Sequence, residues 1–350
     1  MQERDDIRLT ALAASGGNAA KLNTANLTQI RQSSSQENPQ DLLAGARSGA
    51  SAAVTTVNAQ LALLQAVDFV PPVVDDPLIF GGIAAANAMG NIYALGGEVT
   101  VGLHVAAWPD GVPVALLEQI SAGASAKMAE VGATITGGQI VTADSPLYGL
   151  SITGTVDPAR ILTRAGARVG DRLYLTKAIG TGIVLQALKR EASKEEHIAE
   201  ATAGMLHLNR LAAQLAQESG VSACTAIGGF GLVGHAADIA TQSGIRLQIA
   251  LEAVPFLSGA LEYAELGFIP AGIEQSRAYF ASSSDHHVVL PAGLRQSLDD
   301  LLHDPQTSGG LLLTIPAERA AALEAAFARE KTPLWPIGET VAGSGVKVVE

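Results

Sequence analysis

Apolar residues follow regular periods from about residue 52 onwards. Alternating and continuous apolar runs predict strands at Ala53–Val57, Leu61–Val70, Val99–Ala107, Thr134–Thr136 and Leu147–Val156. Small apolar residues at helical spacing predict helices at Phe80–Leu95 and Pro113–Val131. The second strand carries one acid, Asp68, just before the Pro71-Pro72 break.

The second half of the chain follows the same logic with less regularity. We expect a boundary near Asp157–Ala167, strands at Asp171–Thr176, Ala223–Ile227, Ile245–Leu251, Leu311–Ile315 and Val346–Val348, and helices at Glu195–Ser219 and Leu294–Leu302. The segment from the end of the Ile245–Leu251 strand through Val289 has a looser pattern. Because strands and helices alternate irregularly, the sequence predicts an α+β fold and not a doubly wound parallel sheet.

The length of 350 residues favours two domains. We assign residues 1–50 to a flexible glycine- and serine-rich arm, 51–157 to an N-terminal α+β domain and 158–350 to a C-terminal α+β domain. The arm prediction depends on its polar composition, which offers little apolar surface to offset the entropy of ordering.

Composition excludes several classes of protein. A net charge of −12 disfavours a nucleic-acid or anionic-membrane surface. The sequence has no run of about 18 apolar residues and begins without a signal-type apolar stretch, so we expect a cytoplasmic protein that does not span a membrane. The single cysteine, Cys224, forbids an intrachain disulfide and lies in an apolar strand, where a buried thiol is expected.

One glycine motif leaves two interpretations open. Gly229–Gly234 fits the pattern G-x-G-x-x-G, follows an apolar strand and opens a helix, with Glu252 about 20 residues further on. This is the fingerprint of a Rossmann-type dinucleotide enzyme. Glycines at this spacing equally serve close packing of a helix on a strand.

Longer sequence motifs favour a different interpretation of this glycine motif. The sequences GGFGLVGH at 228–235 and DPQTSGG at 304–310, with Thr176–Gly182 and Gly137-Gly138-Gln139, resemble motifs of selenophosphate synthetase (selenide, water dikinase). The resemblance extends from about residue 7 to the C-terminus. It implies the two-domain architecture of the aminoimidazole-ribonucleotide-synthetase-like class, in which N-terminal domains pair into a homodimer and ATP lies between the domains.

The resemblance also implies a site. In that family, aspartates gather Mg²⁺ around the ATP phosphates, and the N-terminal arm brings a lysine and a cysteine or selenocysteine. The matching candidates for nucleotide binding here are Lys21, Asp68, Asn87, Gly137, Gly138 and Gln139. Asp68 is the candidate metal ligand, and Lys21 is a vestige of the catalytic arm.

The chain departs from this pattern where the chemistry occurs. Ser51, Asn91 and Ala226 stand at three of the four metal-ligand positions, and Asn18 stands at the nucleophile position. Mg²⁺ prefers carboxylate, phosphate and water oxygens, and phosphoryl transfer depends on that ion clamp. The absence of three carboxylates and a thiol therefore indicates that the chain has lost the dikinase reaction.

The sequence supports three hypotheses. The first is a selenophosphate-synthetase-like protein that has lost the dikinase reaction and serves as a ligand-binding, regulatory or partner protein, with ATP as a candidate ligand and Mg²⁺ weak or absent. The second is an active ATP-dependent phosphotransferase that uses Asp68 and Lys21. The third is a Rossmann-type enzyme.

Overall fold

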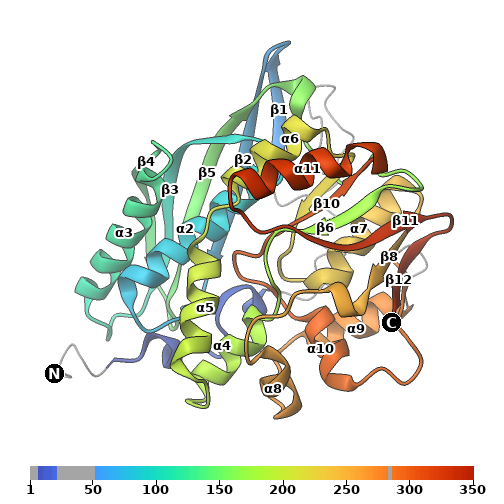
Figure 1. Ribbon diagram of the computed structural model, residues 1–350. Helices are drawn as coiled ribbons and strands as arrows, with labels where there is room; N and C mark the ends of the chain where they lie inside the picture. Colours follow the sequence, from blue (N-terminus) through green and yellow to red (C-terminus); the bar gives the residue numbers. More distant parts are fainter. Residues whose placement is uncertain (1–6, 22–51, 283–285) are drawn as a thin grey trace.

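The structure is a computed structural model that describes residues 7–21, 52–282 and 286–350. Two domains lie side by side, and each pairs a mixed sheet with helices (Figure 1). The predicted α+β fold class is therefore confirmed. Ser51, one of the predicted site positions, lies outside the described residues.

The N-terminal domain is a five-stranded sheet with two helices on one face (Figure 1). Its strand order is β1-β2-β5-β3-β4, and only the β3–β4 pair is parallel. The elements are β1 (Ala52–Asn58), β2 (Leu61–Val70), α2 (Pro77–Tyr93), β3 (Glu98–Trp108), α3 (Val114–Ala129), β4 (Thr134–Thr142) and β5 (Leu147–Val156). Each corresponds to a predicted element.

Local chemistry explains the start of helix α2. The Asp76 carboxylate caps the helix by accepting a hydrogen bond from the Ile79 amide at 2.9 Å. Pro77 follows at the first helical position, where its missing N–H costs nothing. Strand β2 alternates buried and exposed residues, and Asp68 falls in the buried row that faces α2.

The C-terminal domain is a seven-stranded sheet of order β7-β10-β6-β11-β8-β12-β9. Strand β12 runs parallel to β8 and β9, and the other neighbours are antiparallel. Its strands are β6 (Arg172–Leu175), β7 (Ala223–Ala226), β8 (Arg246–Ala250), β9 (Val288–Val289), β10 (Leu311–Ile315), β11 (Trp335–Val341) and β12 (Gly345–Val349). Its helices are α4 (Thr181–Lys189), α5 (Glu195–Leu206), α6 (Arg210–Ser219), α7 (Gly231–Ser243), α8 (Ala260–Glu265), α9 (Ile273–Ser282), α10 (Gln296–His303) and α11 (Ala317–Arg329).

Several expectations for this half were wrong. The single helix predicted at Glu195–Ser219 is two helices, α5 and α6, which break at residues 207–209. The segment before Val289 contains α8, α9 and β9 in place of a loose chain. The periodicity analysis also missed helix α11 and strand β11.

Apolar burial joins the two domains. One continuous cluster of buried residues runs from helix α2 through α6 and α11 to one face of strand β10, including Met89, Leu215, Leu313 and Phe327. A second cluster packs α7 on the opposite face of the C-terminal sheet. Because close-packed interiors resist deformation, this shared core fixes the spacing of the domains.

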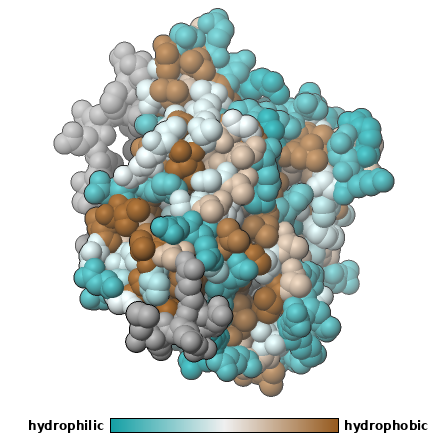
Figure 2. Space-filling model, turned by 90° about the vertical axis from the view of Figure 1, so that its left-hand side faces the viewer, coloured by the Kyte–Doolittle hydropathy of each residue, from teal (hydrophilic) through white to brown (hydrophobic). Residues whose placement is uncertain are grey.

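One face of the N-terminal sheet has no helix over it. Val67, Phe69, Leu103 and Val141 have exposed side chains, between 44% and 56% accessible. Pairing register places Val67 and Leu103 on either side of Ser151, on the same face. Figure 2 shows apolar patches interspersed with hydrophilic surface in a view of this domain's side of the molecule.

Two glycines set the close crossing of α2 and α3, and this generates a stability prediction. A Cβ on Gly123 would lie 2.0 Å from the Leu78 carbonyl oxygen, and one on Gly81 would lie 1.8 Å from that of Ile120. Gly123→Ala should lower the free energy of unfolding by about 2 kcal/mol, because neither backbone can yield freely. Urea unfolding followed by circular dichroism measures this change.

Gly204→Ala is the matched control, since Gly204 also lies in a helix and has open space around its Cβ position. That change should stabilise the protein by about 0.5–1 kcal/mol. Equal effects of the two substitutions would show that the crossing does not require glycine.

Candidate functional site

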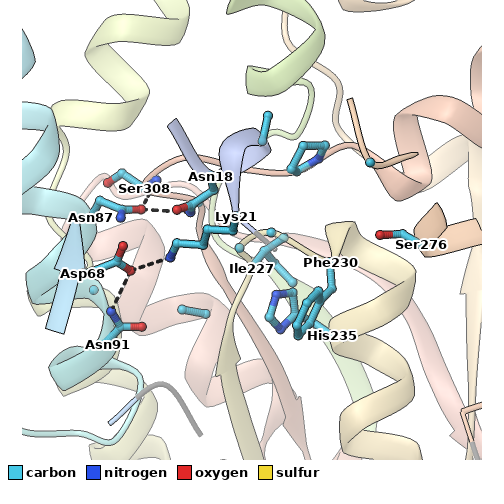
Figure 3. A pocket seen from close by; sticks show the side chains of 18 of the residues that line it. Asn18, Lys21, Asp68, Asn87, Asn91, Ile227, Phe230, His235, Ser276 and Ser308 are labelled. Carbon is cyan, nitrogen blue, oxygen red and sulfur yellow. Dashed lines mark hydrogen bonds and ion pairs between the residues drawn. The ribbon is translucent and has the colours of Figure 1, made fainter. Parts of the chain in front are cut away.

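A cavity of about 300 Å³ lies between the two domains. It is lined by the N-terminal segment, by β2 and α2 of the N-terminal domain, and by the loops around β7 and β10 of the C-terminal domain (Figure 3). Six predicted positions meet there: Asn18, Lys21, Asp68, Asn87, Asn91 and Ala226. Residues up to 289 positions apart in the chain are thus in direct contact across it.

The side chain of Asp68 is only 6% exposed, and only one of its two carboxylate oxygens has hydrogen-bond partners in the described part of the chain. Its Oδ2 atom accepts hydrogen bonds from the Lys21 ammonium at 2.8 Å and from the Asn91 amide at 3.1 Å (Figure 3). Its Oδ1 atom is buried and has no hydrogen-bond partner among the described residues. The Asp68 carboxylate therefore already forms an ion pair with the Lys21 ammonium group.

Asn18 anchors the N-terminal segment. Its side-chain amide donates to Asn87 Oδ1 at 3.0 Å and to the Gln306 carbonyl at 2.7 Å, and its backbone amide donates to Thr307 Oγ1 at 3.0 Å. Asn87 Oδ1 also accepts from the Ser308 amide at 2.9 Å. Asn18, which the resemblance predicts to stand at the nucleophile position, thus bridges the two domains through hydrogen bonds.

The arm expected to be flexible includes this bridge. Residues 7–21 form two 3-10 turns, at Leu9–Leu12 and Gly17–Ala20, which lie against both domains. Asp75 accepts from the Thr10 amide and hydroxyl, and Lys189 donates to the Ala13 and Ala14 carbonyls. These contacts place residues 7–21 against both domains, which their composition did not predict. Residues 1–6 and 22–50 lie outside the described residues, and the flexibility of the arm stays a prediction.

The loop Asp304–Gly310 forms the floor of the cavity and is buried throughout. Gln306 Oε1 accepts from the Gly180 amide at 3.0 Å and from the Thr181 amide at 3.2 Å, at the start of helix α4. Lys177 donates to the Ser308 carbonyl at 2.8 Å and to the His207 carbonyl at 2.6 Å. The loop Asp304–Gly310 is therefore connected by hydrogen bonds to the start of helix α4 and to Lys177.

Burial shifts two pKa values beside this loop in opposite senses. Desolvation raises the pKa of Asp304 to about 8, although hydrogen bonds from Gln306 and Gly182 partly oppose it. Desolvation, together with the positive charge of Lys127, lowers the pKa of Lys177 to about 7. Neither side chain lines the cavity as a charged group, so both belong to the scaffold.

Three predicted nucleotide-binding residues lie elsewhere in this chain. Gly137, Gly138 and Gln139 are on β4, an exposed edge strand, and none of them lines the cavity with Asp68. A Cβ at Gly138 would lie 2.2 Å from the His104 carbonyl oxygen, so close packing on β3 explains that glycine. Their part in nucleotide binding stays a prediction.

The sequence interpretation missed other lining residues. Arg164, Asn209, Ser276 and His303 line the cavity as well, and Phe230 stacks on His235 with ring centroids 5.4 Å apart. Asn209 directly precedes helix α6, and its amide donates to the Gly309 carbonyl at 2.8 Å. Asparagine is common at the start of a helix, so Asn209 was the sequence signal for the break between α5 and α6. The same residue makes the contact with Gly309.

The dinucleotide interpretation of Gly229–Gly234 is wrong for this fold. A Rossmann unit needs neighbouring parallel strands around its helix, whereas three strands separate β7 from β8 in the sheet. Gly231 and Gly234 allow close contact with the His303 backbone and the Phe280 ring, where a Cβ would come within 2.5 Å and 2.7 Å. The glycines therefore serve packing.

Comparison with known proteins gives a consistent result. The family model for the AIR synthase related protein N-terminal domain matches residues 49–156, and the model for the C-terminal domain matches residues 168–350. "Selenide, water dikinase 2" of Peptoclostridium acidaminophilum is 38% identical over 323 residues, which cover 92% of each chain. Selenide, water dikinase of Myxococcus xanthus is 36% identical over 345 residues, covering 98% of this chain and 97% of the relative.

The chain belongs to the selenide, water dikinase family. Solved structures with the same fold include AaThiL complexed with AMPPCP and TMP, with a TM-score of 0.67, 20% identity and 93% coverage of both chains. The hydrogenase maturation protein HypE in complex with ATP has a TM-score of 0.60 and 19% identity, over 83% of this chain and 79% of that one. Within the residues described for this family member, no helix is long and apolar enough to cross a membrane.

The Asp304 pKa generates a prediction about stability and pH. The folded-state value of about 8 lies above an unfolded value of about 4, so the stabilisation is complete below pH 4 and is lost as pH rises through 8. Asp304→Asn removes this titration and keeps an acceptor for the Gly182 amide. Raising the pH from 6 to 9 should therefore lower the free energy of unfolding by about 3 kcal/mol more in the unmodified protein than in the variant.

Urea unfolding at several pH values measures the difference between the two proteins. Lys177 titrates in the opposite sense in both of them, so its contribution cancels in the comparison. Parallel pH profiles would contradict a protonated, buried Asp304.

Proposed function

We propose that this chain is a selenophosphate-synthetase-like protein that has lost the ATP- and selenide-dependent dikinase reaction and keeps its interdomain cavity for a nucleotide or another small ligand. The observation that carries this proposal is the scarcity of acids in the cavity, since Asp68 is the only carboxylate among the described lining residues. Asn18, Asn91 and Ala226 lie there at positions where the family pattern has a thiol or selenol and two carboxylates.

The loss of the ion clamp is the first argument. Ions around a triphosphate need several carboxylates to balance their charge, and phosphoryl transfer leaves little other work for the protein. Among the described residues, no group of three or more His, Cys, Asp and Glu side chains is arranged to hold a metal. Asp68 alone remains, and Lys21 already pairs with it.

The loss of the nucleophile is the second argument. A carboxamide at position 18 has no ionisable thiol to offer a selenium or phosphorus centre. The chain's one cysteine, Cys224, is buried in strand β7, and burial raises its thiol pKa to about 12. A thiolate is therefore not available from this side chain near neutral pH.

An active phosphotransferase is the second candidate function. Lys21 and Asp68 remain together in the cavity, within reach of the start of helix α7, whose amides favour an anion. This arrangement would act on an acceptor other than selenide or with fewer ions. The turnover experiment below separates it from the first proposal.

We also infer that the protein is a homodimer that pairs through the uncovered face of its N-terminal sheet. Burial of the apolar side chains of β2, β3 and β4 provides the driving force, and the lost acids do not contribute to it. A stable dimer is consistent with a regulatory or partner role in selenium metabolism.

We predict that the protein makes no selenophosphate from ATP and selenide in the presence of Mg²⁺, because the cavity lacks both the ion clamp and the nucleophile. Phosphorus-31 NMR of the reaction mixture detects the product directly. A selenophosphate signal above that of the protein-free sample would contradict the proposal, and ATP consumption with another acceptor would favour the second candidate.

Restoring the acids provides the positive control. The combined substitutions Ser51→Asp, Asn91→Asp and Ala226→Asp should recover Mg²⁺-dependent ATP binding better than any one of them, because metal ligands act as a unit. Isothermal titration calorimetry measures the affinities. An equal gain from a single substitution would show that the ligands are independent.

We predict a dimer in light scattering at micromolar concentration. Leu103→Glu places a charge on the uncovered sheet face and should yield monomers, since an unpaired charge is costly to bury. Val169→Glu is the matched control, because Val169 is also exposed but lies in the C-terminal domain, just before strand β6 and outside this sheet. A monomeric unmodified protein would refute the proposed interface.

A further inference from the structure

The charges of the cavity nearly cancel. Among the described lining residues, the formally charged side chains are Lys21, Asp68 and Arg164. Lys21 pairs with Asp68 at 2.8 Å, and Arg164 pairs with Asp238 at 3.0 Å. A polyanion such as free ATP would therefore have to compete with existing ion pairs for each cation.

A divalent ion does not restore the balance. The Asp68 oxygen nearest the arm is already shared by the Lys21 ammonium and the Asn91 amide, and an Mg²⁺ ion there would meet a positive charge. Ala226, on the opposite wall, offers no oxygen from its side chain. The metal–triphosphate unit that would suit a carboxylate-lined cavity does not suit this one.

Uncharged side-chain amides make up much of the polar lining of the cavity. Asn18, Asn87, Asn91 and Asn209 all line the cavity. Asn18 is 5% exposed and Asn87 is 7% exposed. Two of their atoms, the acceptor Asn18 Oδ1 and the donor Asn87 Nδ2, are buried with no hydrogen-bond partner among the described residues.

These unpartnered atoms point to a ligand. Buried polar atoms in folded proteins are nearly always hydrogen-bonded, because leaving one unpaired costs its full desolvation. A neighbouring donor and acceptor suit a molecule with both functions, such as a sugar hydroxyl or a base edge. The cavity of about 300 Å³ is at the small end for ligand sites, which favours a nucleoside over a nucleoside triphosphate.

We infer that the cavity binds an uncharged polar molecule of nucleoside size, without a divalent metal ion, through Asn18 and Asn87. The inference rests on the proposed function, that the cavity is a ligand site without dikinase chemistry, and it names the class of ligand. Recognition at this site then depends on hydrogen bonds to carboxamides and not on charge balanced by metal ions.

Calorimetric titration with adenosine, AMP and ATP, each in EDTA and in Mg²⁺, tests this inference. Adenosine should bind in EDTA, and Mg²⁺ should change its Kd by less than about twofold, because no ion takes part. Affinity should fall by at least about tenfold from adenosine to ATP, since each phosphate adds unbalanced negative charge.

Asn87→Asp supplies the residue-specific arm of the experiment. Asp keeps the acceptor used by Asn18 and Ser308 but exchanges the unpartnered donor for an anionic oxygen. Adenosine binding should weaken by at least about tenfold. Asn58→Asp is the matched control, because Asn58 is exposed on β1 and the hydrogen bond that its side-chain oxygen accepts from the Gln60 amide survives the change. Circular dichroism verifies that both variants fold.

The outcomes separate the inference from the proposed function. Tighter binding of ATP than of adenosine, only with Mg²⁺, would overturn the inference while leaving a ligand site in place. An unchanged adenosine Kd in Asn87→Asp would overturn the assigned contact. Binding of none of the three probes, by a protein whose acid-restored variant binds Mg²⁺-ATP, would overturn both.

Discussion

The buried loop Asp304–Gly310 holds the site together. Its backbone lies in the interior, so each of its polar groups needs a partner within the protein. Asn18 of the N-terminal segment, Asn87 of the N-terminal domain, and Lys177 and Thr181 of the C-terminal domain supply those partners. Three parts of the chain that are remote in sequence therefore converge on one short loop, and the cavity is the space that they leave.

The loop's position does not depend on the candidate metal-ligand residues. The hydrogen bonds that hold the loop come from amides, hydroxyls and one buried lysine, and none of those described involves Asn91 or Ala226. Carboxylates gathered for metal binding repel one another in the absence of the ions, so Asn91 and Ala226 destabilise the fold less than acids at these two positions would. Asp68 is different because Lys21 and Asn91 compensate it.

Sequence patterns predicted the elements whose signals are local. The alternation in β2 and the small-residue periodicity of α2 gave the correct strand and helix, with Asp68 facing the site. The apolar pattern at 195–219 continued through the break at 207–209, because both helices bury an apolar face, each partly against α2, and Asn209 was the available sign of the interruption. The short elements α8, α9 and β9 depend on tertiary packing, which no local pattern records.

The same limit applies to the site. Motif register placed Asn18, Lys21, Asp68, Asn87, Asn91 and Ala226 in one cavity, because a family pattern encodes long-range contacts. Arg164, Ser276 and His303 reach the cavity through the packing of the C-terminal domain and carry no motif of their own. The position of residues 7–21 could not be predicted from their composition either, since it depends on hydrogen bonds to residues elsewhere in the chain, such as Asp75 and Lys189.

Manganese binding, measured by electron paramagnetic resonance in the presence of ATP, tests most directly whether the cavity still holds divalent ions. Mn²⁺ takes the same oxygen ligands as Mg²⁺ and gives a signal that changes on binding to protein. A neutral cavity predicts a spectrum identical to that of Mn²⁺ and ATP without protein. A protein-dependent change that disappears in Asp68→Asn would contradict the loss of the metal site.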